Sequence, residues 1–251
     1  MSSRLEHRLF LFLVVTMVWS VAMRLQLGGV RSEDFKKPIT CSYFNGQPIL
    51  DVELASSHDC FRSVVTQEGP DQLKHNAQVF RSNIYMDFVF IALYWTVFVL
   101  LARVEGGRWS NWVIGFISSS ALFDVLENAR ILKGLSELLA LGRIQGVLPR
   151  PFSVVKWAML GVTLGCIGAV LWSRAERVSR LLSAALFAAG VLTLAGLLIP
   201  VAMAWAGYCF ALVLILSIVR FWPYSIESLR VGIEYAYLMR FQVLSGLTIH
   251  R

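Results

Sequence analysis

The sequence has few charged residues for its length. Only 16% of its 251 residues are Asp, Glu, Lys or Arg, whereas 57% are hydrophobic. Soluble domains carry about a quarter charged residues, so the composition disfavours a soluble protein. A run of about 20 apolar residues forms a helix long enough to cross the hydrocarbon core of a bilayer, and several such runs are present. We therefore expect an all-α polytopic membrane protein that contacts the lipid bilayer.

The motifs of common catalytic and metal sites are also absent. The chain has no Walker phosphate loop, no G-x-S-x-G, no H-E-x-x-H and no C-x-x-C. The four histidines (His7, His58, His75 and His250) all lie outside the apolar runs, which argues against haem or histidine-bound metal in the membrane. We expect neither a metal nor a cofactor. The net charge of +7 comes without a block rich in Lys and Arg, so nucleic acid is not an expected partner.

About six transmembrane helices are predicted, at residues 9–27, 84–102, 111–129 and 152–172 and in the two halves of 181–219. The last run has 39 residues, and it would form a helix of roughly 58 Å, about twice the thickness of a bilayer core. Pro200 lies at its middle, and a proline inside a helix removes a backbone donor and breaks or kinks the helix. We interpret the run as two spans joined by a tight turn at 196–200. The alternative is one long kinked helix.

The spans divide the chain into four parts. These are a first span that is also a signal-anchor at 1–27, an extracytoplasmic loop or cap at 28–83, a five-span bundle at 84–219 with an amphipathic interfacial segment at about 131–148, and a tail at 220–251. A cleaved signal peptide is the alternative for the first part, but no clear cleavage site follows its apolar run. The tail fits either a membrane-lying helix or a strand, and we prefer the helix.

Positive residues in the short loops predict the orientation. Arginines follow the 84–102 and 152–172 spans and also lie at both ends of the chain. Because Lys and Arg are enriched in cytoplasmic loops, the N-terminus and the C-terminus are predicted to be cytoplasmic, in a membrane of the plasma-membrane type. The loop at 129–152 is also basic and opposes this topology.

Two cysteines lie in the predicted extracytoplasmic loop. Cys41 and Cys60 are separated by 18 residues, while Cys166 and Cys209 lie inside apolar spans. Outside the cytoplasm such a pair forms a disulfide, and a cross-link of this length stabilises a fold by about 3 kcal/mol in the chain-entropy model. Free thiols are the main alternative. A zinc site with His58 is disfavoured, because the spacing lacks the close cysteine pair of ordinary zinc sites.

Polar residues interrupt the apolar pattern on three predicted spans at one depth. On the 111–129 span they recur at i, i+4 and i+7/i+8, which places them on one helical face. The neighbouring spans bring a lysine and an aspartate to the same level. Unpaired charges in lipid are costly, so these side chains should face one another inside the bundle. The candidate polar cluster comprises Asp87, Ser120, Asp124, Glu127, Asn128, Arg130 and Lys156.

Lys156 is expected to pair with Glu127 or Asp124. Three acids against one lysine leave an excess of negative charge. Either Arg130 reaches back as a second cation, or one acid is protonated, because burial and a like charge both raise the pKa of a carboxyl group. The cluster has three interpretations: a solvated span end, a structural clamp between helices, or a site for a ligand, proton or ion.

Two functional classes fit these features. The first is an accessory subunit or a ligand-binding or transport-type membrane protein, with other membrane subunits or a lipid as partner. The second is a membrane-embedded enzyme acting on a lipid or isoprenoid, with Asp124 or Glu127 as acid or base. We prefer the first class, because the carboxylates lack a histidine or a recognisable metal-binding pattern beside them.

Overall fold

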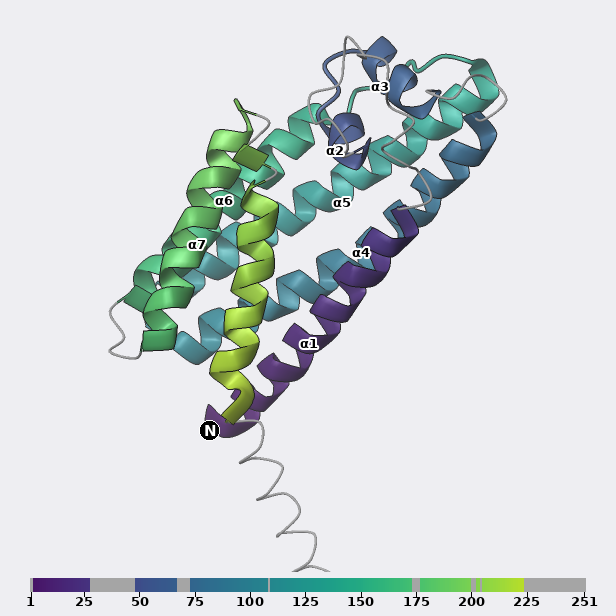
Figure 1. The fold of residues 1–251 in the computed structure, drawn as a ribbon. Helices are drawn as coiled ribbons and strands as arrows, with labels where there is room; N and C mark the ends of the chain where they lie inside the picture. The colour runs from purple at the N-terminus through teal and green to yellow at the C-terminus, as the bar shows by residue number, and fades with distance from the viewer. Residues whose placement is uncertain are drawn as a thin grey trace, which may run out of the picture.

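Helices make up the regular secondary structure of the described chain. The computed structural model describes residues 2–27, 48–66, 73–107, 109–172, 177–199, 202–203 and 205–223, and no strand occurs within these ranges. The all-helical prediction is therefore confirmed for this part of the chain. The helices are α1 (Ser2–Leu27), α2 (Pro48–Glu53), α3 (His58–Val65), α4 (Leu73–Glu105), α5 (Ser110–Leu141), α6 (Arg150–Trp172) and α7 (Arg177–Gly196), and a further helix covers 205–223 (Figure 1).

Five helices in the described ranges are long and apolar enough to cross a membrane, which fits a helical membrane protein. They are Arg4–Leu25, Leu73–Glu105, Arg150–Trp172, Arg177–Gly196 and Trp205–Pro223. The third predicted span falls on α5, which is 32 residues long but is not one of the five. Its buried face carries Asp124, Glu127 and Asn128, which lower its mean hydropathy. Hydropathy alone therefore supports five of the six predicted spans.

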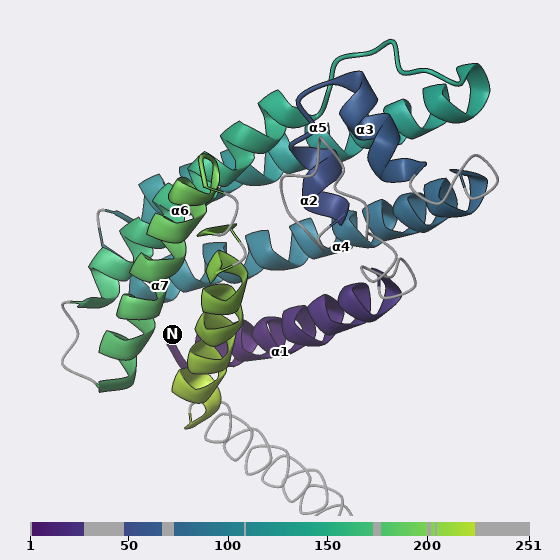
Figure 2. The same ribbon diagram turned by 45° about the horizontal axis from the view of Figure 1, so that its top comes forward.

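The long helices pack as neighbours in chain order. α1 lies against α4, α4 against α5, α5 against α6, and α6 against α7 (Figures 1 and 2). The Trp19 indole of α1 donates a 3.0 Å hydrogen bond to the backbone oxygen of Met86 on α4. The 205–223 helix returns to the start of α1, where the rings of Phe10 and Trp222 pack 5.5 Å apart. One apolar core runs through these helices.

Glycines allow α6 and α7 to approach closely. A Cβ atom on Gly190 would lie only 2.8 Å from the backbone oxygen of Gly161. Farther along the same contact, the Ser183 hydroxyl donates a 2.6 Å hydrogen bond to the backbone oxygen of Gly168. Close backbone packing at small residues is typical of helices in membranes, where dispersion replaces the hydrophobic effect as the attraction between helices.

The short helices α2 and α3 lie together over one end of the bundle, and we call them the cap helices (Figure 2). The Phe61 ring of α3 packs directly against Gly134 of α5. A Cβ atom on Gly134 would lie only 3.2 Å from this ring. Together with Phe61, the side chains of Ile131, Leu135 and Leu138 of α5 are buried in a second apolar core beneath the cap helices. We expected a separate interfacial helix at about 131–148. Residues 131–141 instead continue α5, and one face of this extension, with Ile131, Leu135 and Leu138, is buried against the cap helices.

The helix ends close to Pro200, as the sequence predicts. α7 ends at Gly196, and the next helix is established by residue 205. The alternative of one long kinked helix is therefore wrong, because residues 197–199 are not helical. A Cβ atom on Gly196 would meet Met203 at 2.8 Å, so glycine is needed where the chain passes close to itself. The predicted tail beyond residue 223 lies outside the described residues.

Candidate functional site

Lys156 is the centre of a buried ionic cluster. It lies in the second turn of α6, and only 4% of its surface is exposed. Its Nζ atom is 2.7 Å from Glu127 Oε2, 3.1 Å from Asp124 Oδ1 and 3.2 Å from Glu53 Oε2. Both predicted pairings of this lysine therefore occur together, and a third carboxylate joins them.

α5 supplies the face that the spacing predicts. Ser120, Asp124, Glu127 and Asn128 are all buried, and Glu127 is 0% exposed. The helix continues past these residues to Leu141, so the interpretation as a solvated span end is wrong for Glu127. Its second oxygen, Oε1, is buried and has no hydrogen-bond partner among the described residues.

Two hydrogen bonds connect this face of α5 to α4. The Tyr94 hydroxyl donates to Asp124 Oδ2 at 3.0 Å, and the Asn128 amide donates to Asp87 Oδ2 at 2.7 Å. Asp87 also interacts electrostatically with Asp124 and Lys156. It lies in the middle of α4, so it does not act as a helix cap. The structure thus brings together the acids of both helices.

The remaining two predicted members differ in their roles. The Ser120 hydroxyl donates a 3.1 Å hydrogen bond to the backbone oxygen of Lys156, which ties α5 to α6 below the ionic contacts. Arg130 forms no ion pair within the described ranges. Its guanidinium lies over the ring of Phe152, 5.9 Å from the centroid. The expectation that it supplies a second cation is therefore wrong, because it turns to the start of α6 instead.

Sequence reasoning missed Glu53, which comes from the cap. The Trp157 indole donates to Glu53 Oε2 at 3.3 Å, and the Ser153 hydroxyl donates to the backbone oxygen of Glu53 at 2.8 Å. The nearby sequence alternates acids with apolar residues at Asp51 and Glu53, and both are buried. That alternation was the available signal, but more than 100 residues separate Glu53 from Lys156, which hides the contact from any local pattern.

The cluster has an excess of carboxyl groups. Among the described residues, three carboxylates contact one ammonium group and Asp87 lies nearby, and Tyr94 and Asn128 donate to two of these four carboxyl groups. Burying unequal charges is costly unless further positive charge or protons compensate them. We call this set the acidic cluster; it comprises Glu53, Asp87, Asp124, Glu127, Asn128 and Lys156. Within the described ranges, no three His, Cys, Asp or Glu side chains are arranged to hold a metal ion.

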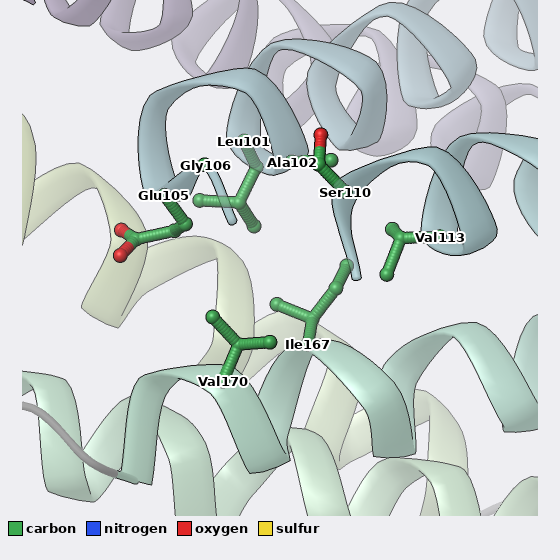
Figure 3. A pocket seen from close by; sticks show the side chains of 8 residues that line it. All are labelled: Leu101, Ala102, Glu105, Gly106, Ser110, Val113, Ile167 and Val170. Atoms are coloured by element: carbon green, nitrogen blue, oxygen red, sulfur yellow. The ribbon is translucent and has the colours of Figure 1, made fainter. Parts of the chain in front are cut away.

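A second buried ion pair lies far from the acidic cluster. Arg220 Nη1, on the 205–223 helix, is 2.6 Å from Glu105 Oε1 at the end of α4. Beside it is a cavity of about 10 Å³, about the room that one water molecule needs. Figure 3 shows that apolar side chains such as Leu101 and Ile167 line this cavity and that the Glu105 carboxylate points away from them. The cavity is too small and too apolar to hold a substrate.

The predicted disulfide has one end outside the described residues. Cys60 is buried in α3, and the free cysteines of the described ranges are Cys166 and Cys209. Because the position of Cys41 is not described, its bond to Cys60 stays a prediction. His58 Nε2 forms a 2.8 Å hydrogen bond with the backbone oxygen of Gly146, so it ties the cap to the loop after α5.

Comparison with known proteins gives no relative: no family model, no curated protein and no solved structure matches the chain.

Proposed function

We propose that this chain is a ligand-binding or transport-type membrane protein, or an accessory subunit of one, and that its acidic cluster binds a positively charged ligand or a proton. The observation that carries the proposal is the ratio of four carboxyl groups to one ammonium group in a buried site. Ionisable residues within a helical membrane bundle are uncommon and costly, and they usually mark a functional site.

Glu127 has a buried oxygen atom without a hydrogen-bond partner among the described residues. Its Oε2 atom forms an ion pair with the Lys156 ammonium group, while Oε1 is buried without a hydrogen-bond donor. A buried polar atom without a partner costs about 1–3 kcal/mol, and more when it is charged. A proton on this oxygen or a bound cation beside it removes that cost. A purely structural clamp would instead favour equal numbers of acids and bases.

The position of the cap relates the acidic cluster to one side of the membrane. Glu53 reaches Lys156 from α2, which belongs to the segment between the first two predicted spans. Basic residues in the other short loops favour an extracytoplasmic position for this segment. We therefore propose that the acidic cluster lies toward the outer side of the membrane and that Glu53 covers it from the cap.

The test measures whether cations stabilise the protein through Glu127. Full-length protein in lipid nanodiscs is unfolded thermally across a pH series and with chloride salts of ammonium, methylammonium, sodium and choline at equal ionic strength. We expect at least one small cation, or acidification, to raise the midpoint of unfolding. Glu127→Gln should abolish that increase.

Glu105→Gln is the matched control, because it makes the same chemical change at another buried glutamate. It should lower the midpoint of unfolding but leave the cation and pH responses unchanged. The proposal is wrong if the wild-type protein responds only to ionic strength, or if Glu127→Gln retains the full response.

The second candidate is an enzyme acting on a lipid or isoprenoid. The observation that favours it is an apolar groove between α4 and α5, whose residues Phe88 and Val125 directly follow Asp87 and Asp124 in the sequence. Asp124 is poorly suited to act as acid or base there, because Tyr94 and Lys156 occupy its two oxygens. Glu127, with its free oxygen, would take that role.

A further inference from the structure

The groove between α4 and α5 has a volume of about 290 Å³. Its bottom includes the buried Ile91, and its rims carry Trp95, Leu122 and Val125, which are between 38% and 58% exposed. The exposed rims lie on two helices of a bundle that fits a membrane, so the groove opens toward the lipid. It is therefore open to a molecule that arrives within the bilayer.

Hydrogen bonds between the two helices close the groove at both ends. At one end the Trp95 indole donates to the Ser118 hydroxyl at 3.0 Å. At the other end the Asn128 amide donates to Asp87 at 2.7 Å. The groove residues on α4 run from Phe88 to Trp95, which corresponds to about 10 Å along the helix. Asp87 of the acidic cluster therefore lies on α4 one helical turn before the groove residue Ile91.

The groove has the dimensions of a single hydrocarbon chain. Its volume of about 290 Å³ extends along about 10 Å of α4, which gives a mean cross-section of about 29 Å². A helix with its side chains is about 10–12 Å across and packs in membranes on small residues. Large rim residues such as Trp95 and Leu122 leave no such flat stripe. The groove therefore fits a slender alkyl chain better than a helix of a partner protein.

The charge of Asp87, near the end of the groove where Asn128 lies, determines which head group a bound amphiphile would carry. Asp87 accepts one hydrogen bond from Asn128, and it is the one carboxyl group of the acidic cluster that forms no ion pair with Lys156. It directly precedes Phe88 of the groove and lies one helical turn before Ile91. A cationic group placed here would offset the excess of negative charge. A phosphate placed here would add to it.

We propose that the ligand is an amphiphile with a primary ammonium group carried directly at the end of one hydrocarbon chain. The chain lies in the groove between α4 and α5, and the ammonium group donates hydrogen bonds to Asp87. This inference rests on the proposed function, since it identifies the chemical class of the positively charged ligand. It adds a second contact surface that the acidic cluster alone does not provide.

The experiment uses three photoactivatable probes with the same alkyl chain and different heads: a primary amine, an alcohol and a carboxylic acid. Each is added to full-length protein in phosphatidylcholine nanodiscs, and the labelled peptides are quantified by mass spectrometry. We expect the amine to label the 88–95 and 121–125 segments about tenfold more than the alcohol, since a hydrogen bond to a charged group is worth about that factor. The carboxylic acid should label them least.

Two variants locate the contacts. Asp87→Asn should reduce labelling by the amine to the level of the alcohol. Ala92→Phe fills the groove and should remove labelling of both segments by all three probes. Val191→Phe is the control, because this side chain is 63% exposed on α7, away from the groove. Competition by unlabelled alkylamine on the wild-type protein gives the same information without any variant.

Equal labelling by the three probes would overturn the choice of head group. Labelling of these segments no greater than that of α7 would overturn the groove as the binding surface. Both results leave the Glu127-dependent response to protons or small cations standing, so the failure of this inference differs from the failure of the proposed function. If that response is absent as well, the proposed function itself fails.

Discussion

Two buried ionic sites in the described part of the chain differ in their balance of charge. At one end of the bundle, Glu105 of α4 meets Arg220 in a pair of one acid and one base. At the other end, Lys156 alone holds three carboxylates, and Asp87 lies beside them. Asp87 and Glu105 are 18 residues apart on α4, about 27 Å along the helix. One helix therefore carries both arrangements.

The difference fits two roles: an ion pair that joins two helices and, as we propose, a cluster that binds a proton or a cation. The Glu105–Arg220 ion pair joins α4 to the 205–223 helix, with one charge of each sign in the contact. The acidic cluster also joins helices, but it does so with more acids than a single lysine can neutralise. Because uncompensated buried charge is destabilising, the excess is consistent with a site that gains stability when a proton or cation arrives.

The largest effect is expected from removing the single base of the acidic cluster. Lys156→Met leaves three carboxylates without their ammonium partner, and breaking a buried ion pair costs about 3–5 kcal/mol. We expect the folded protein to be lost or its thermal midpoint to fall steeply. Lys133→Met is the control, because its side chain is 58% exposed and pairs only at 3.8 Å with Glu137. Equal stability of the two variants would contradict a central role for Lys156.

A double-mutant cycle at each site would sharpen the comparison. Arg220→Met alone should cost about 3 kcal/mol, and adding Glu105→Gln should recover part of the loss, since both partners are then neutral. Lys156→Met combined with Glu127→Gln should recover less, because Asp124 and Glu53 remain charged. Chemical unfolding in mild detergent measures both cycles. Equal recovery at the two sites would remove the distinction between them.

Reduction of the predicted disulfide should loosen the cap above the acidic cluster. Cys60→Ser is expected to lower stability by about 3 kcal/mol if Cys60 is bonded to Cys41. Because α2 and α3 pack together, hydrogen exchange should then rise around Glu53 but stay unchanged around Glu105. Labelling of both thiols in unreduced protein would contradict the disulfide.

The smallest effect concerns the loop after α5, on the cap side. The backbone N–H groups of Gln145 and Gly146 donate to Glu137 Oε2 and lower the pKa of this carboxyl group below its ordinary value of 4.5. A lowered pKa in the folded state means that the carboxylate stabilises the loop above pH 4.5 and loses this effect as the pH falls through the folded value. Glu137→Gln should remove that acid-dependent step from the hydrogen exchange of 142–149. An unchanged pH profile would show that these hydrogen bonds contribute nothing measurable.

Several parts of the candidate site could be read from spacing. Asp124, Glu127 and Asn128 share one face because residues three and four apart on a helix lie on the same side. The pairing with Lys156 followed from depth, since antiparallel neighbours bring the end of one helix to the start of the next. Arg130 was misjudged because a position one turn away did not reveal that Phe152 would attract its guanidinium.

Composition and periodicity by themselves determined the helical class, most of the long helices and the break near Pro200, because apolar runs and proline act locally on the backbone. Only the tertiary structure decided that α5 continues under the cap, since Ile131, Leu135 and Leu138 are buried there against Phe61 and its neighbours. It also decided that Glu53 completes the site of Lys156. Contacts across more than 100 residues depend on how the whole chain packs, and no local pattern encodes them.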